Sequence, residues 1–218
     1  MHKIEMGTKK PDNFTESWSG QYTFFSFLEY ACSIPNVLFA ITTVKENGQP
    51  NVCFHSWGTF CGDGQSFHAI LGGINQQGHT MKNIARTGEF SVNFLSMAYY
   101  DSLIATIQKN DDGQDEFLAG GFTKEQAETV SAPRIGEAFL CLECKLDQTL
   151  DLSGAGIISL VIGKVMHIAM QPEYAKGMDA RYEDKGFMFN VHCPKNLTTG
   201  EGSTSGIAVL DVKRIITE

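Results

Sequence analysis

The sequence lacks the features that would place it at once in several large classes of protein. It contains no run of 18 apolar residues, and its first residues carry no apolar core of a signal peptide. Lysine and arginine are scattered and the formal net charge is −8, so a nucleic-acid backbone would meet no basic surface. Internal repeats and low-complexity segments are also absent. We therefore expect a soluble globular protein with neither a nucleic-acid partner nor a membrane partner.

Three catalytic signatures are missing as well. The sequence contains no Gly-x-Ser-x-Gly elbow, no Gly-x-x-x-x-Gly-Lys-Ser/Thr loop and no dinucleotide fingerprint after a predicted strand. Triad hydrolases and P-loop enzymes are therefore disfavoured. The six cysteines do not form the close pairs of a small secreted disulfide scaffold, so we expect a cytoplasmic protein.

Two sets of potential ligand residues do not have the geometry of a metal or redox site. Cys141 and Cys144 form a C-x-x-C pair on a predicted strand, 137–146, where positions three apart point to opposite faces. We expect Cys144 to be a small core residue. His55 and His68 lie on neighbouring predicted strands but lack a third ligand at suitable spacing, so no metal site is predicted.

The sequence does contain ample material for a β-rich core. Hydrophobic residues make up 42% of the chain, and the turn dipeptides Asn47-Gly48 and Asp63-Gly64 separate apolar runs. The runs predict strands at 37–44, 50–62 and 67–71. Parallel neighbours need long crossover connections, so strands joined by tight turns form an antiparallel meander. The predicted fold is therefore a barrel or a sandwich.

The rest of the chain is expected to complete a single domain, 1–218. Residues 1–20 read as an extended arm, and the aromatic segment 22–30 must pack on the body or on a second copy, so 1–30 is predicted to be an N-terminal extension. Helical spacing is present at 99–107, an acidic loop at 110–116 and a capping-box-like helix start at 123–126. Further strands are predicted at 137–146, 157–170, 188–191 and 207–216.

A short predicted helix after the third strand is the first candidate binding site. Thr80 is a suitable N-cap, Met81, Ile84 and Ala85 share one side, and Gly88 can end the helix. Polar residues precede the helix, and the N–H groups of its first turn suit a phosphate. A capped helix that binds only water is the alternative. The candidate residues are Asn75, Gln76, Gly78, His79, Thr80, Lys82 and Asn83.

The strand at 51–60 is the second candidate. Ser56 and Gly58 are small enough to let a flat ligand approach the backbone, and Trp57 offers a wall. An ordinary half-buried strand with a tryptophan fits the same residues equally well. Composition alone leaves the two interpretations open.

The order of these motifs resembles the flavin reductase-like family of FMN-binding split barrels, and its flavoredoxin-type branch in particular. The likeness extends from about residue 35 to residue 170. It is carried by Pro35-Asn36-Val37, Asn47-Gly48-Gln49-Pro50-Asn51, Ser56-Trp57, Thr80-x-Lys82-Asn83-Ile84, Thr87-Gly88-Glu89-Phe90-x-Val92-Asn93, Ala132-Pro133-Arg134-Ile135 and Ile162-Gly163-Lys164-Val165.

The resemblance implies a mainly β fold, a six-stranded antiparallel Greek-key split β-barrel with a few short helices. It also implies a homodimer with non-covalent FMN near the dimer interface. His55, Ser56 and Trp57 would line the isoalloxazine ring, and the helix-start residues named above would hold the ribityl phosphate. Many relatives have a basic residue where this chain has Asn75-Gln76, so Lys82, N–H groups or a second subunit must meet the phosphate charge.

The functional implication is an oxidoreductase in which FMN carries electrons from NADH or NADPH to an acceptor. The flavin supplies the redox chemistry, so no side chain is predicted to be catalytic. One alternative is an FMN electron carrier that a partner protein reduces. Another is a barrel without flavin that serves assembly. The electron acceptor would be a redox partner protein or a small molecule.

Overall fold

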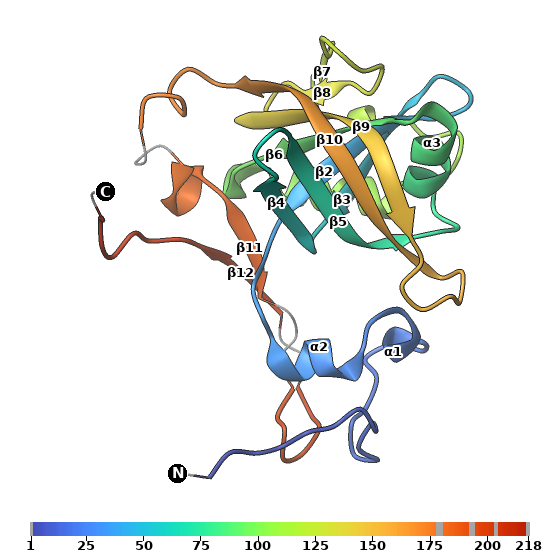
Figure 1. Cartoon of the computed structure of the whole chain (residues 1–218), viewed down its shortest axis with the longest axis vertical. Coiled ribbons are helices and arrows are strands. Elements are labelled where there is room, and N and C mark those ends of the chain that lie inside the picture. Colours follow the sequence, from blue (N-terminus) through green and yellow to red (C-terminus); the bar gives the residue numbers. More distant parts are fainter. Residues whose placement is uncertain (1, 178–180, 192–194, 203–204, 217–218) are drawn as a thin grey trace. The chain divides into compact units, whose positions relative to one another are not determined.

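The structure is a computed structural model that describes residues 2–177, 181–191, 195–202 and 205–216. The chain forms two compact units (Figure 1). The first contains Met1–Asn36 and Phe189–Ala208, and the second contains Val37–Met188 and Val209–Glu218. None of the helices in the described ranges combines the length and the apolarity that a bilayer span requires.

The second unit is built around one antiparallel sheet of seven strands. These are β2 (Phe39–Val44), β3 (Pro50–His55), β4 (Gly58–Gly62), β5 (Phe67–Asn75), β6 (Glu89–Phe94), β9 (Leu140–Leu150) and β10 (Ile158–Met170). Their order is β3-β2-β6-β9-β10-β5-β4, and every neighbouring pair is antiparallel. Figure 1 shows the long strands β9 and β10 side by side. The predicted antiparallel barrel is confirmed.

A sharp bend at Ser56 and Trp57 closes this sheet. β3 and β4 are consecutive in the chain, yet they occupy opposite ends of the strand order. At the bend, the backbone N–H of Gly72 donates to the carbonyl of Trp57 at 2.8 Å, which joins β5 to the bend. The predicted single strand 50–62 is therefore two strands, and the sheet has seven strands instead of the predicted six.

The connection order confirms the predicted Greek key. β2, the bent β3–β4 segment and β5 follow one another around the barrel, and β6 then returns to lie beside β2. This spatial order, with the fourth element beside the first, defines the motif.

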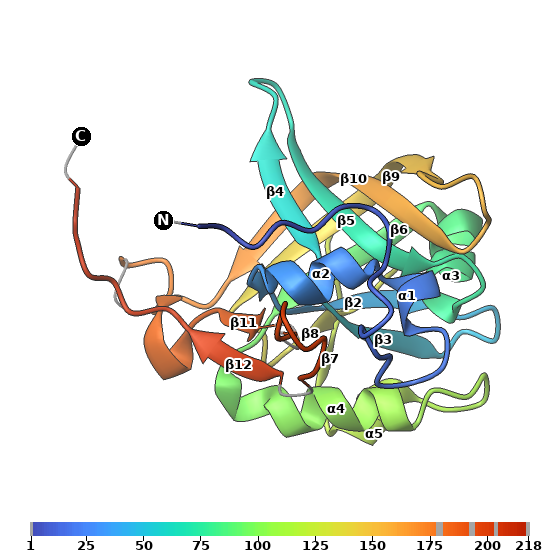
Figure 2. The same ribbon diagram turned by 90° about the horizontal axis from the view of Figure 1, so that it is seen from below.

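Among the described residues, short helical elements accompany the barrel: α3 (His79–Thr87), η1 (Met97–Tyr99), α4 (Tyr100–Gln108), α5 (Glu116–Gly120) and η3 (Glu183–Lys185). Figure 2 shows α4 and α5 side by side along β3. The predicted helix at 99–107 is confirmed as η1 and α4.

Four predicted boundaries are wrong. Residues 123–126 do not start a helix, because β7 (Lys124–Glu125) pairs with β8 (Arg134–Ile135). The acidic loop ends earlier than predicted, since the carboxylate of Asp115 caps α5 by accepting from the Phe117 and Leu118 N–H groups. β5 continues through Gly72-Gly73 to Asn75. The predicted last strand, 207–216, is only the short β12 (Gly206–Val209).

The barrel interior is apolar, whereas the outer face of β6 is polar and covered. Phe39 and Phe90 are fully buried in the interior, with Cys144, as predicted for that cysteine. Outside, Ser91 Oγ donates to the Ala132 carbonyl at 3.0 Å, and Asn93 Oδ1 accepts from the Ile135 N–H at 2.9 Å. The segment before β8 therefore covers β6 with its polar groups paired, as buried polar groups require.

Gly163 on β10 is packed so closely that it admits no side chain. A Cβ there would lie 2.3 Å from Phe90 Cζ and 3.2 Å from Cys144 Cβ. We expect Gly163→Ala to lower the free energy of unfolding by about 2 kcal/mol, because overpacking displaces a buried ring. Gly113→Ala is the matched control, since a Cβ at that loop position meets nothing within 4 Å. Equal urea midpoints for the two variants would contradict the prediction.

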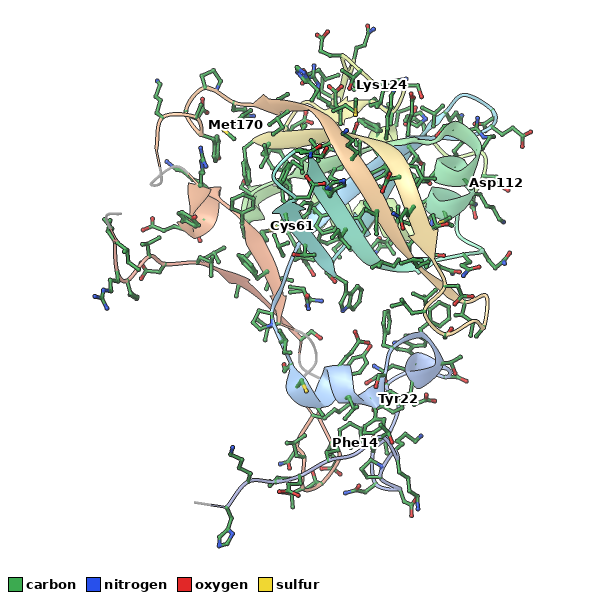
Figure 3. The ribbon with its side chains drawn as sticks, viewed as in Figure 1. Phe14, Tyr22, Cys61, Asp112, Lys124 and Met170 are labelled. Carbon is green, nitrogen blue, oxygen red and sulfur yellow. The ribbon has the colours of Figure 1, made fainter. Side chains whose placement is uncertain are left out.

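The first unit holds an aromatic cluster. It contains α1 (Gln21–Phe24) and α2 (Phe27–Cys32). Phe14 is buried and packs on Tyr22 and Phe27, with ring centroids 6.2 Å and 5.7 Å away. Figure 3 shows Phe14 and Tyr22 close together. The predicted arm is therefore anchored at Phe14, and the aromatic rings pack on one another within their own unit.

A separate small sheet has the order β1-β11-β12. β1 is Asn36–Val37 and β11 is Met188–Val191, as predicted for the latter. The third strand is the short β12 defined above.

Candidate functional site

The candidate site is a cavity of about 270 Å³ in the second unit, beside the outer edge of β3. Its lining comes from β3, β5, the start of α3 and the end of α4. The residues are Asn51, Val52, Cys53, Phe54, His55, Gly73, Ile74, Asn75, Gly78, His79, Thr80, Ile107 and Asn110.

β3 presents its edge to this cavity. Side chains on a strand alternate between faces, so five consecutive lining residues, Asn51 to His55, indicate that the backbone itself borders the cavity. β3 is the end strand of the sheet order, and its outer peptide groups have no neighbouring strand within the sheet. The outward Val52 N–H donates to the Glu116 carboxylate, and the remaining outer peptide groups of β3 can serve a ligand as donors and acceptors.

The start of α3 borders the other end of the cavity. The N-cap is Gly78, with no side-chain cap, so the predicted N-cap role of Thr80 is wrong. Thr80 lies in the first turn, where its hydroxyl oxygen accepts from Asn51 Nδ2 at 3.2 Å. The first N–H groups of a helix have no partner within it, and here they lie at the cavity. This end suits an anion.

The buried side of α3 differs from the predicted one. Ile84 is fully buried as expected, but Ala85 is exposed and Asn83 is buried in its place. Asn83 Nδ2 donates to Thr43 Oγ1 on β2 at 3.0 Å, a long-range contact that fixes the rotation of the helix. The end of the helix is as predicted, with Gly88 in the left-handed conformation at φ 68°.

His55 is the buried imidazole of the cavity wall. Its Nε2 lies 2.7 Å from the carbonyl oxygen of Gly72, and its ring packs against Phe39 and Trp57 with centroids 5.7 Å away in both cases. Burial lowers the pKa of His55 to about 4, although the contact with the Gly72 carbonyl opposes this shift. The ring is therefore neutral near pH 7.

His79 is held by the acidic loop that follows α4. Its Nδ1 lies 3.1 Å from Asn110 Oδ1, and its Nε2 lies 2.8 Å from Asp112 Oδ1. Figure 3 shows Asp112 beside α3. Both ring nitrogens are thus engaged by the protein, which leaves the ring face of His79 for contact with a ligand.

A second, smaller hollow of about 160 Å³ adjoins the first at His79. It contains two cations on successive turns of α3, Lys82 and Arg86. Arg86 Nη2 also donates to the carbonyl of Val44, so its guanidinium is partly committed. The remaining lining residues are Lys45, Glu46, Asn83 and Asp112.

The structure brings together half of the ten predicted site residues. His55, Asn75, Gly78, His79 and Thr80 line the main cavity. Lys82 and Asn83 line the second hollow. Ser56 and Trp57 form the bend beyond the lining, and the Gln76 backbone N–H donates to the Ile157 carbonyl at 2.9 Å. The roles of all ten toward a ligand stay predictions.

A buried ion pair behind the cavity was not predicted. Lys45 Nζ lies 2.8 Å from Glu116 Oε1, with the two side chains 6% and 0% exposed. Lys45 Nζ also donates to the carbonyls of Asp111 and Gln114, at 3.0 Å each. Glu116 Oε2 accepts from the backbone N–H of Val52 at 2.5 Å. The pair therefore fixes the acidic loop against β3.

Opposing effects act on the pKa of Glu116 in this pair. Burial raises the pKa of Glu116, while Lys45 and the Val52 N–H oppose the shift by stabilising the carboxylate. Nothing local in the sequence signals the pairing, because each residue alone has the pattern of an ordinary surface charge.

The antiparallel barrel has the free edge of β3 beside the start of α3. This architecture is that of a split barrel. Residues 31–188 match the family described as flavin reductase like domain. The chain therefore belongs to the flavin reductase-like family, which confirms the resemblance, and membership of this family implies flavin binding.

Solved structures share the fold at low sequence identity. A protein with a split barrel domain from Shewanella frigidimarina NCIMB 400 has a TM-score of 0.73 and 18% identity, covering 98% of this chain and 100% of its own. For nitrilotriacetate monooxygenase component B from Bacillus cereus the values are 0.72 and 17%, with the same coverage. For flavoredoxin of Desulfovibrio vulgaris (Miyazaki F) they are 0.60 and 18%, covering 84% and 90%.

Two curated relatives match over shorter stretches, and both are uncharacterised. The relative from Aquifex aeolicus (strain VF5) is 39% identical over 67 residues, 31% of this chain and 34% of the relative. The relative from Methanothermobacter thermautotrophicus (strain Delta H) is 27% identical over 105 residues, 48% and 50% of the two chains. The chain thus spans about a third of the length of the first curated relative and about half of the second.

Proposed function

We propose that the main cavity binds FMN without a covalent link and that the protein is an oxidoreductase. Electrons would pass from NADH or NADPH to an acceptor, and the flavin would supply the redox chemistry. The observation that carries the proposal is the joint lining of one cavity by the open edge of β3 and the start of α3. This arrangement matches the two ends of FMN, a planar ring with a polar rim and a phosphate.

The chain's own groups divide between these two ends. Outward peptide groups of β3, other than the Val52 N–H that donates to Glu116, would hold the polar rim of the ring. First-turn N–H groups of α3 and the Lys82 ammonium would meet the phosphate, with no basic residue needed at Asn75-Gln76. Ser56 and Trp57 would act indirectly, by bending β3 so that its edge stays open.

The size of the cavity favours a homodimer as the complete binding unit. Its volume, about 270 Å³, is at the lower limit of the roughly 300–1,000 Å³ typical of small-molecule sites. One chain would therefore leave part of the flavin exposed, and a second copy in a cytoplasmic homodimer would cover it.

Binding is tested by titrating the purified protein with FMN and with riboflavin, followed by flavin fluorescence. We expect FMN to bind at least tenfold tighter, because only FMN carries the phosphate. Lys82→Gln should lose about tenfold affinity for FMN and none for riboflavin, since a hydrogen bond to a charged group contributes about 1.5–3 kcal/mol. Lys176→Gln, an exposed lysine outside both hollows, is the matched control. A protein that binds neither flavin would refute the proposal and favour a role in assembly.

Reductase activity is tested by anaerobic addition of NADH or NADPH to the FMN-loaded protein. We expect the flavin absorbance near 450 nm to bleach with one of the two donors. Retained absorbance with both donors, together with bleaching by a reducing partner protein, would identify an electron carrier instead.

A further inference from the structure

The side chain of His55 has one ring nitrogen committed to the protein and one left over. Nε2 lies 2.7 Å from the carbonyl oxygen of Gly72, and a carbonyl can only accept. Nε2 therefore carries the proton, and in a neutral imidazole Nδ1 then carries the lone pair. Nδ1 makes no hydrogen bond with any of the described residues, and His55 lines the cavity together with Gly73, where an added Cβ would lie 3.6 Å from His55 Cε1.

The surroundings of His55 keep it in this state. Its ring neighbours are Phe39 and Trp57, neither of which carries a charge. Burial lowers its pKa to about 4, so a proton does not occupy Nδ1 near neutral pH. The cavity wall thus presents a fixed, uncharged acceptor.

We propose that His55 Nδ1 accepts a hydrogen bond from a ring N–H of the bound ligand. A carbonyl or phosphate oxygen placed there would face a lone pair, whereas an N–H would satisfy it. The inference rests on the proposed function for the identity of the ring. An isoalloxazine has an N3–H in every oxidation state, and it gains an N5–H, with an N1–H in its neutral form, only when it is reduced.

Chemical variation of the flavin tests this contact. Wild type, His55→Phe and His68→Phe are titrated with FMN and with 3-methyl-FMN, which lacks the N3–H. His68 is the matched control because it lies on β5 outside the cavity lining. Melting temperatures verify that each variant is folded. His55→Leu, which has no hydrogen-bonding group in its side chain, is used if the phenylalanine variant does not fold.

If N3–H is the donor, we expect wild type and His68→Phe to bind FMN about tenfold tighter than 3-methyl-FMN. The His55 variant should bind both forms equally. If N5–H is the donor, wild type should not discriminate against 3-methyl-FMN. Its bound flavin should instead have a midpoint potential about 30 mV above that of the His55 variant, which corresponds to a tenfold preference for the reduced form.

Two results would overturn the inference. Unchanged selectivity between the two flavins and an unchanged potential in the His55 variant would refute the contact alone and leave flavin binding intact. Failure of wild type to bind any flavin would refute the proposed function and, with it, this contact.

Discussion

Replacing Lys45 with methionine is expected to lower the free energy of unfolding by about 3–5 kcal/mol, the usual effect of removing one partner of a buried ion pair. Methionine retains the length of the side chain but leaves Glu116 buried without its cation. The carbonyls of Asp111 and Gln114 also lose their donor. Urea unfolding of the variant, with Lys176→Met as an exposed-lysine control, measures the loss.

The double variant Lys45→Met/Glu116→Gln separates the buried charge from general damage. A glutamine oxygen can still accept from the Val52 N–H and carries no charge, so we expect the double variant to be more stable than Lys45→Met alone. Lower pH should likewise reduce the loss of stability in Lys45→Met. Burial already raises the pKa of Glu116, and without Lys45 the folded protein takes up a proton more readily, so the deficit shrinks as pH falls. A loss below 1 kcal/mol at pH 7 would contradict this account.

Local signals correctly predicted the Asn47-Gly48 turn and the C-terminal end of α3. The Asn47-Gly48 turn has Gly48 at φ 83°, and Gly88 ends α3 at φ 68°, because glycine alone adopts these angles without cost. The apolar run at 37–44 predicted a strand, and β2 forms there because branched side chains suit a strand that is covered on both faces.

The features that depend on distant contacts were not predictable from local patterns. Trp57 has φ 62°, a costly conformation for a bulky residue, and it is held by the hydrogen bond from Gly72 on the neighbouring strand β5. The capping-box pattern at 123–126 was overridden by the pairing of Lys124 with Ile135. Asn83 is buried only because Thr43 receives its hydrogen bond.

The candidate site also contains some features that follow from local sequence and others that depend on distant contacts. The polar lining at the start of α3 was predicted from the residues before the helix, because helix-start chemistry is local. Of the three residues predicted on the strand, only His55 lines the cavity, since the bend at Ser56 and Trp57 depends on contacts with β5. The Lys45–Glu116 pair and Asn110 reach the site only through the packing of α4 and α5 on β3.

The free energy of unfolding is expected to fall by roughly 3 kcal/mol between pH 7 and pH 4 through His55 alone. Its pKa is about 4 in the fold and near 6.5 in the unfolded chain, and one unit corresponds to 1.36 kcal/mol. Between these values the unfolded chain binds the proton and the folded chain does not. The stabilising contribution is therefore complete above pH 6.5, declines as pH falls and is lost near pH 4.

The contribution of His55 is isolated by comparing the stability of wild type with that of His55→Phe. His55→Phe has no titrating group at this position, while all other ionisable residues are shared with wild type. Urea unfolding at several pH values should therefore show the gap between wild type and His55→Phe moving by roughly 3 kcal/mol in favour of the variant from pH 7 to pH 4. His68→Phe serves as the histidine control. Parallel curves for wild type and His55→Phe would mean that His55 has the same pKa in the folded and the unfolded chain, which would contradict a pKa lowered by burial.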